Sequence, residues 1–197
     1  MKIIEKQVDV IDYNGIEQIA EIKFNIGVFL AINTYDKNNN HTGYMRMYFH
    51  PNNRLYLDVI YCYNEFRGSG IASFISELTD YILRDYQGYV IRGCYEPSQL
   101  STDRENKIDY NNQELDVYVR KFYNKAGYEI IKYEEYLNNQ EKYPYLTIND
   151  FFLDEGGYNV VVAKIIKLKD YSFYEEDGMI YYKKYINKKN ICKYRNK

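Results

Sequence analysis

The stretch that decides the fold runs from Leu55 to Leu83 and reads LYLDVIYCYNEFRGSGIASFISELTDYIL. Its first part alternates with period two and is rich in branched and aromatic side chains, which is typical of a β-strand. The odd-numbered residues from Leu55 to Tyr63 are expected on one face of that strand.

After Phe66 the period changes to that of an α-helix, because apolar residues recur at spacings of three and four. These residues are Ile71, Phe74, Ile75, Leu78 and Ile82. Gly68 and Gly70 lie in the turn between strand and helix. Backbone N–H groups at a helix start have no partner within the helix, and glycine lets a ligand come close. The helix dipole adds partial positive charge at the same place. The turn is therefore either a phosphate cradle or an ordinary strand–helix junction. The glycine spacing excludes the dinucleotide fingerprint and the P-loop.

Two motifs in order carry a resemblance to a known family. Arg67-x-x-Gly70-x-Ala72 resembles the Arg/Gln-x-x-Gly-x-Gly/Ala signature of the GNAT (GCN5-related) N-acetyltransferases, and it stands between a strand and a helix as in that family. Downstream, residues 122–128 read FYNKAGY, which is similar to the family's FYxxxGF segment. The resemblance covers about residues 27 to 168.

The resemblance implies an α+β fold of the α/β-type three-layer kind. Its central sheet is mixed and mostly antiparallel, with a splayed parallel strand pair and flanking helices. The splayed pair would be residues 55–63 and 89–95, and we expect one acetyltransferase-like domain over residues 1–170 with a Tyr/Lys-rich C-terminal extension over 171–197.

The remaining patterns place further elements along the chain. Residues 3–26 favour a hairpin at Asn14-Gly15, where the family usually has helices. Strands are predicted at 28–34, 43–49, 128–132 and 159–167. A helix is predicted from an apolar stripe that ends before Gly127 and consists of Leu115, Tyr118, Val119, Phe122 and Ala126. Residues 96–112 form an insertion that is either functional or mobile, and residues 134–157 form a second insertion.

Acetyl-CoA is the co-substrate that the resemblance implies. Its pyrophosphate would be held by backbone groups of Gly68, Ser69, Gly70, Ile71 and Ala72. Arg67 would add charge at the rim of this cradle. The backbone of Ile60, Tyr61 and Cys62 would pair with the pantetheine arm, and an N–H near Ile60 would stabilise the thioester carbonyl.

Proton transfer is assigned to Tyr123, which matches the family's general acid and would protonate the departing thiolate. The alternative is a core aromatic on the helix stripe, although Phe122 fits that stripe better. Tyr56 stands near the position of the family's basic glutamate, so Asp58 or Glu96 is the candidate base. Either carboxylate could equally be an ordinary solvated one, with water carrying the proton.

Composition and charge restrict the classes of partner that we expect this chain to bind. The formal charge of −2 over 197 residues does not favour a nucleic-acid partner. No apolar run reaches membrane length. Cys62, Cys94 and Cys192 have no metal spacing, which indicates reduced thiols, a cytoplasmic setting and no metal site. His41 and His50 lie at a hairpin and are expected at the surface, where neither supports a cysteine nucleophile. The 26 tyrosines make a homodimer possible.

Two functions therefore stay open. The first is an N-acetyltransferase that moves the acetyl group of acetyl-CoA directly to an amine on a small molecule or a protein. The second is a catalytically weak GNAT-like scaffold that binds CoA or a protein partner. The short N-terminal region, the missing glutamate and the long insertions favour the second, and the two motifs favour the first.

Overall fold

The computed structural model describes residues 3–12, 14–86, 88–95, 112–151, 160–167, 170–184 and 186. The chain divides into two units, Met1–Tyr89 with Ile165–Lys197, and Val90–Lys164. Each unit is described by itself.

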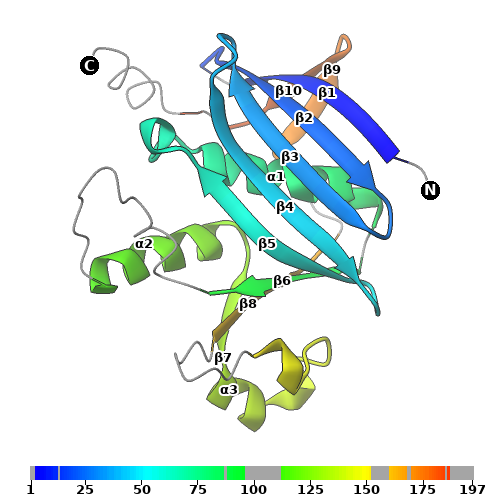
Figure 1. Ribbon diagram of the computed structural model, residues 1–197, viewed down its shortest axis with the longest axis vertical. Helices are drawn as coiled ribbons and strands as arrows, with labels where there is room; N and C mark the ends of the chain where they lie inside the picture. Colours follow the sequence, from blue (N-terminus) through cyan, green and yellow to red (C-terminus); the bar gives the residue numbers. More distant parts are fainter. Residues whose placement is uncertain are drawn as a thin grey trace. The chain divides into compact units, whose positions relative to one another are not determined.

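Five antiparallel strands form a meander in the first unit (Figure 1). They are β1 (Ile3–Asp12), β2 (Glu17–Asn25), β3 (Phe29–Asp36), β4 (His41–His50) and β5 (Arg54–Cys62). The hairpin predicted for residues 3–26 is confirmed, and Gly15 takes a φ of +68° in its turn. The turns between successive strands are short, and a short turn can join two paired strands only if they run antiparallel.

The C-terminal segment adds two strands that the sequence pattern did not predict, β9 (Phe173–Glu176) and β10 (Met179–Tyr182). β10 pairs with β1 in parallel, with Val10 opposite Ile180. The strand order in this unit is β5-β4-β3-β2-β1-β10-β9. Burial of Phe173, Ile180 and Tyr182 stabilises this hairpin, and its many tyrosines and lysines hid that pattern in the sequence.

The fold class is confirmed, because antiparallel strands predominate, a parallel pair is present and helices accompany the strands. The described parallel pair is β1 with β10. Residues 55–63 and 89–95 fall mainly in different units, so their splayed pairing stays a prediction.

Helix α1 (Ile71–Ile82) covers one face of the meander, and Figure 1 views the sheet from the opposite face. Its predicted apolar stripe is largely confirmed, since Ile71, Phe74, Ile75 and Leu78 are at most 1 % exposed. The ring of Phe74 packs against Phe173 at 5.7 Å and Tyr182 at 5.2 Å between centroids. The helix therefore packs on both the meander and the C-terminal hairpin.

Strand β5 contains an irregularity that corrects the predicted alternation. Val59 lies opposite Arg46 and Leu57 opposite Met47, so Asp58 is an extra residue in β5. Such a bulge exchanges the two faces of a strand. Ile60 and Cys62 consequently lie opposite buried Met45 and Gly43 on the α1 face, and the odd-numbered residues beyond the bulge leave that face.

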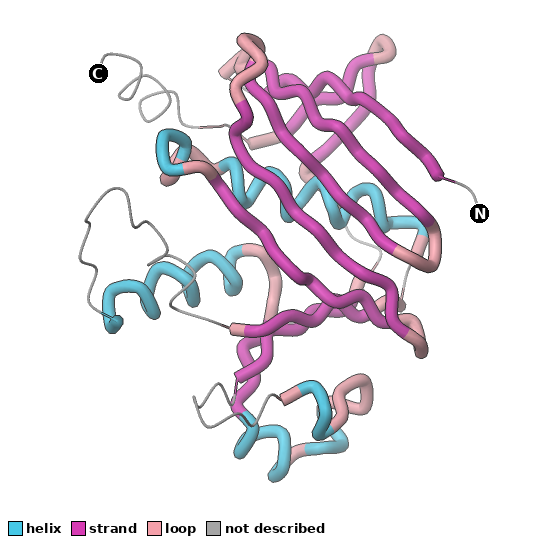
Figure 2. Tube along the Cα trace, in the orientation of Figure 1, coloured by secondary structure: helices cyan, strands magenta, loops and turns pink. Residues whose placement is uncertain are grey.

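In the second unit, helices alternate along the chain with the strands of a small sheet (Figure 2). Its elements are β6 (Val90–Cys94), α2 (Asn112–Lys125), β7 (Glu129–Lys132), α3 (Tyr133–Asn138) and β8 (Val160–Ile165). The strand order is β7-β8-β6, and β7 runs antiparallel to β8. The predicted strands and helix of this region are confirmed within one to three residues of their ends.

Much of the second predicted insertion is an ordered, packed segment. Residues 133–151 form α3 and two 3-10 turns, Gln140–Lys142 and Ile148–Asp150. They share a core with β7 and β8 that consists of Ile131, Tyr136, Tyr143, Leu146, Phe151, Val161 and Ala163. Asp150 also forms a buried ion pair with Arg92, with 2.8 Å between Oδ1 and Nε. Residues 152–157 and the insertion at 96–111 lie outside the described residues.

No helix in the described part of the chain is both long enough and apolar enough to span a membrane.

We predict that Gly43 is essential for the close packing of α1 against the sheet. A Cβ at this position would lie 2.7 Å from the Tyr61 carbonyl oxygen and about as close to α1, 3.0 Å from Ile75 and 3.1 Å from Ile71. Gly43→Ala should lower the free energy of unfolding by about 1–3 kcal/mol, because backbone must move to admit the methyl group. Urea unfolding measures this, and an unchanged midpoint and slope would contradict the close approach.

Candidate active site

The glycine turn joins β5 to α1 through a short 3-10 turn, Asn64–Phe66. The backbone N–H of Ser69 donates to the Phe66 carbonyl at 3.2 Å, and the Ser69 hydroxyl donates to the same oxygen. Gly68 and Gly70 have φ values of +73° and +99°, which L side chains rarely adopt. The two glycines are therefore required by the backbone path that leads into the helix.

Gly70 is also the N-cap of α1. The first helical hydrogen bond runs from the Phe74 N–H to the Gly70 carbonyl at 2.9 Å. The amides of Ile71, Ala72 and Ser73 precede that bond, so the helix itself supplies them with no acceptor. Together with the helix dipole they make the turn positive, and this arrangement fits a phosphate group.

Arg67 ties the turn to the end of β5. Its Nε donates to the Cys62 carbonyl at 3.4 Å, and its guanidinium carbon lies 5.7 Å from the centre of the Tyr61 ring. Ile60, Tyr61, Cys62 and the turn thus lie together in the first unit.

The Cys62 thiol faces α1, half-buried opposite Gly43. Burial raises the pKa of Cys62 to about 12, although the Arg67 charge and the Ala72 backbone N–H act to lower it. A thiol with that pKa is protonated at neutral pH, so Cys62 is a poor nucleophile.

Asp58 occupies the bulge of β5 and is exposed to solvent. Its carboxylate lies 3.7 Å from Nε of Arg46. The second candidate base, Glu96, lies outside the described residues.

His41 is half-buried in a group of aromatic rings. It lies 4.8 Å from the ring centres of both Tyr35 and Tyr63. His41 is therefore only partly at the surface, because rings from neighbouring strands pack around it, whereas His50 is exposed as expected. In the described residues no group of three or more His, Cys, Asp or Glu side chains could hold a metal ion.

Tyr123 belongs to the second unit and lies in the last turn of α2. It is 3 % exposed, and its ring lies 5.3 Å from Tyr128 and 6.2 Å from Tyr95. The predicted stripe of α2 is confirmed at Val119, which is buried, and wrong at Tyr118, which is 59 % exposed. Phe122 is only half-buried, so Tyr123 takes the buried place that the stripe gave to Phe122. The helix closes as the motif implied, with Gly127 at a φ of +81°.

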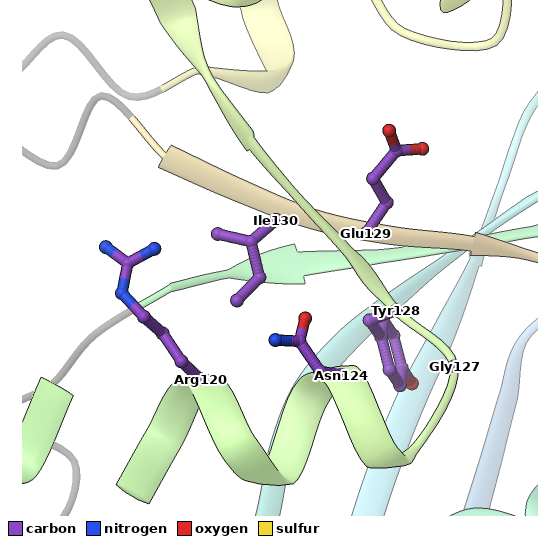
Figure 3. A pocket seen from close by; sticks show the side chains of 6 residues that line it. All are labelled: Arg120, Asn124, Gly127, Tyr128, Glu129 and Ile130. Atoms are coloured by element: carbon purple, nitrogen blue, oxygen red, sulfur yellow. The ribbon is translucent and has the colours of Figure 1, made fainter. Parts of the chain in front are cut away.

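A surface pocket of about 560 Å³ lies beside this tyrosine group (Figure 3). It is lined by Arg120, Asn124, Gly127, Tyr128, Glu129 and Ile130. Figure 3 shows Arg120 and Asn124 projecting from α2 towards the strand that carries Ile130. Tyr123, the predicted general acid, does not line this pocket. The Tyr128 ring lines the pocket and also contacts Tyr123.

Sequence patterns missed two cations that lie over the Tyr95 and Tyr128 rings. The guanidinium carbon of Arg120 lies 5.2 Å from the centre of the Tyr95 ring, and Nζ of Lys164 lies 4.4 Å from that of Tyr128. Lys164 could have been noticed as the one charge inside the apolar run of residues 160–166.

Comparison with known proteins gives similarity in structure alone. No family model matches the sequence, and no curated protein matches it. The chain is similar to a GNAT-family acetyltransferase from Staphylococcus aureus, with a TM-score of 0.47, 13 % identity, and 72 % of this chain and 70 % of that one covered. It is similar to the ribosomal-protein-S18-alanine N-acetyltransferase of Escherichia coli, with a TM-score of 0.43, 9 % identity and 77 % of each chain covered. The PaiA N-acetyltransferase of Thermoplasma acidophilum, solved with coenzyme A, has a TM-score of 0.41, 13 % identity, and 70 % and 61 % coverage.

Alkylation should reveal the protonated state of Cys62. With a pKa of about 12 set mainly by burial, Cys62 should react with iodoacetamide at pH 8 at least about a hundredfold more slowly than free cysteine, whose pKa is about 8.5. Its rate should keep rising as the pH increases towards 12, because the thiolate fraction keeps growing. Peptide-resolved mass spectrometry measures both, and a plateau near pH 9 would contradict the buried thiol.

Proposed function

We propose that this chain is a GNAT-type acyltransferase that transfers the acetyl group of acetyl-CoA directly to an amine. The observation that carries the proposal is the turn from β5 to α1, in which Gly68 and Gly70 take left-handed φ values directly before a helix. The residues of the Arg67-x-x-Gly70-x-Ala72 motif form this turn.

The turn binds the donor in this proposal. Of the predicted backbone donors from Gly68 to Ala72, the N–H groups of Gly68, Gly70 and Ile71 hold the pyrophosphate, because the Ser69 N–H donates to the Phe66 carbonyl and the Ala72 N–H to the Cys62 thiol. Arg67 adds positive charge at the edge. The backbone of Ile60 to Cys62 orients the pantetheine arm. Acetyl-CoA supplies the acetyl group as a thioester, and an N–H near Ile60 stabilises the negative charge that develops on the carbonyl oxygen.

Tyr123 acts as the general acid and gives its hydroxyl proton to the departing sulfur. A tyrosine has a reference pKa of about 10 and a thiol of about 8.5, so the transfer needs no large perturbation of either group.

The attacking amine must first lose a proton. Asp58, which forms an exposed ion pair with Arg46, and Glu96 remain the candidate bases. Water takes the proton if neither carboxylate does. The acceptor is an amine on a small molecule or a protein, and the reduced thiols of Cys62 and Cys94 favour a cytoplasmic setting.

Gly70→Glu should abolish binding of CoA, because a carboxylate and its side chain would enter the cradle. For the wild type, CoA at about 100 times its Kd should stabilise the fold by about 2.7 kcal/mol, and this gain should disappear in the variant. Thermal shift and calorimetry measure it. Gly15→Glu is the matched control, since Gly15 also has a positive φ but lies in a hairpin turn with no atom within 4 Å of its Cβ position. Equal CoA binding by Gly70→Glu and wild type would overturn the assignment of the cradle.

Tyr123→Phe should leave CoA affinity unchanged and lower turnover by about 10²–10⁴-fold, the usual contribution of a general acid. Release of free thiol from acetyl-CoA, screened over polyamines, aminoglycosides, lysine peptides and protein N-termini, measures turnover. Unchanged turnover in the variant would remove the role of Tyr123. If CoA binds and no amine gives thiol release in the wild type, the chain is the binding scaffold and not an enzyme.

A further inference from the structure

Helix α1 packs against the C-terminal hairpin, β9 and β10, through residues that share one face of the helix. Phe74, Glu77 and Tyr81 follow one another at spacings of three and four, so they lie on the same side. The Tyr81 ring lies 5.4 Å from the ring of Phe173 between centroids. Oε1 of Glu77 lies 2.6 Å from Nζ of Lys184. The hairpin therefore contacts the middle and the last turn of α1 as well as its first turn.

The contact at the first turn is a group of three aromatic rings. Phe74 lies 5.7 Å from Phe173 and 5.2 Å from Tyr182, and the two hairpin rings lie 4.9 Å apart. All three side chains are buried. Tilted and edge-to-face ring pairs are directional, because the positive edge of one ring meets the negative face of the other. The two hairpin rings therefore fix the place of Phe74.

The backbone of Phe74 takes part in the glycine turn. Its N–H donates to the Gly70 carbonyl at 2.9 Å. That carbonyl and the Ile71 N–H belong to one peptide unit, which is planar and trans, so they point in opposite directions. The hydrogen bond consequently sets the direction of the Ile71 N–H, which is one of the donors that the proposed function assigns to the pyrophosphate.

The turn itself does little to hold this peptide unit in place. Gly68 and Gly70 both have positive φ values, and glycine has more backbone freedom than any other residue. The bonds from Ser69 to the Phe66 carbonyl hold only the residue between the two glycines. The direction of the Ile71 N–H therefore depends on the helix side of the turn.

We propose that Phe173 and Tyr182 are positioning residues for the donor. They act through Phe74, whose ring they hold and whose amide bond to Gly70 directs the Ile71 N–H towards the phosphate. The proposal rests on the proposed function, since it needs the pyrophosphate of acetyl-CoA in the glycine turn. It assigns a part in donor binding to the C-terminal extension, which lies outside both family motifs.

The expected effect on affinity follows from the order of the first helical turn. A helix end opens with a free energy near zero unless other contacts hold it, so loss of one ring contact disorders the turn in a large fraction of molecules. The apparent Kd rises in inverse proportion to the fraction that stays ordered.

Kinetics separate positioning of the donor from a merely structural role. The cradle amides meet acetyl-CoA equally in the ground state and in the transition state. Their loss should therefore raise the KM for acetyl-CoA and leave kcat nearly unchanged. A purely structural role would lower the amount of folded protein and leave the KM unchanged.

Phe173→Leu removes the ring and keeps a branched apolar side chain in the core. In this variant the Phe74 amide should lose most of its protection and exchange with deuterium within about twofold of an unprotected amide. With at most about a third of the molecules ordered, the Kd for CoA should rise at least about threefold. NMR without ligand measures the exchange, and calorimetry measures the Kd. Tyr182→Leu removes the other ring and should give the same two changes if Phe173→Leu does not fold.

Tyr181→Leu is the matched control. Tyr181 precedes Tyr182 on β10 and points to the opposite face of the hairpin. Its ring stacks on Tyr174 at 5.2 Å. The variant weakens the hairpin without removing a ring that packs on Phe74, so the exchange of that amide and the Kd for CoA should stay within about twofold of wild type.

An unchanged Phe74 exchange or an unchanged Kd in the ring variants would overturn the proposal. An equal loss of affinity in Tyr181→Leu would also overturn it, because hairpin stability in general would then control binding. A wild type that binds no CoA would refute the proposed function and this proposal together. A wild type that binds CoA with an affinity that the ring variants keep would refute this proposal alone.

Discussion

The close approach of α1 to the β4–β5 pair at Gly43 is the constraint on which the candidate donor site depends. A single methyl group there would meet a carbonyl oxygen of β5 and two side chains of α1. Because glycine removes that obstacle, the start of the helix lies directly against the end of β5. The amides of the glycine turn and the backbone of Ile60 to Cys62 consequently belong to one rigid junction and not to a loose loop.

The bulge at Asp58 works together with this junction. One extra residue in β5 moves Ile60 and Cys62 to the face that α1 covers, and it presents Tyr61 on the other face, where Arg67 packs on its ring. The bulge therefore sets which side chains meet the helix and which meet Arg67. Without it, the strand would place the opposite set of side chains under the helix.

Aromatic side chains make much of the core packing in both units. Phe74, Phe173 and Tyr182 join α1 to the C-terminal hairpin, and a core with three tyrosine and phenylalanine rings supports residues 133–151. In the second unit, three further tyrosine rings surround the last turn of α2. Tyrosine suits these positions because its ring fills a core while its hydroxyl can reach water or a polar partner.

The amino-acid sequence by itself determined the meander, the glycine turn, α1 and the closing of α2, because each rests on local periodicity or on a glycine that the backbone requires. The residues of the proposed donor cradle are consecutive in the chain, so a local sequence motif is enough to name them. The tertiary structure alone decided the face of Ile60 and Cys62, the parallel pairing of β10 with β1 and the burial of Tyr123 ahead of Phe122. It also brought Lys164 and Arg120 to the rings around Tyr123. Those features depend on which strand or helix lies opposite, and a contact between residues distant in the chain leaves no periodic signal in either segment.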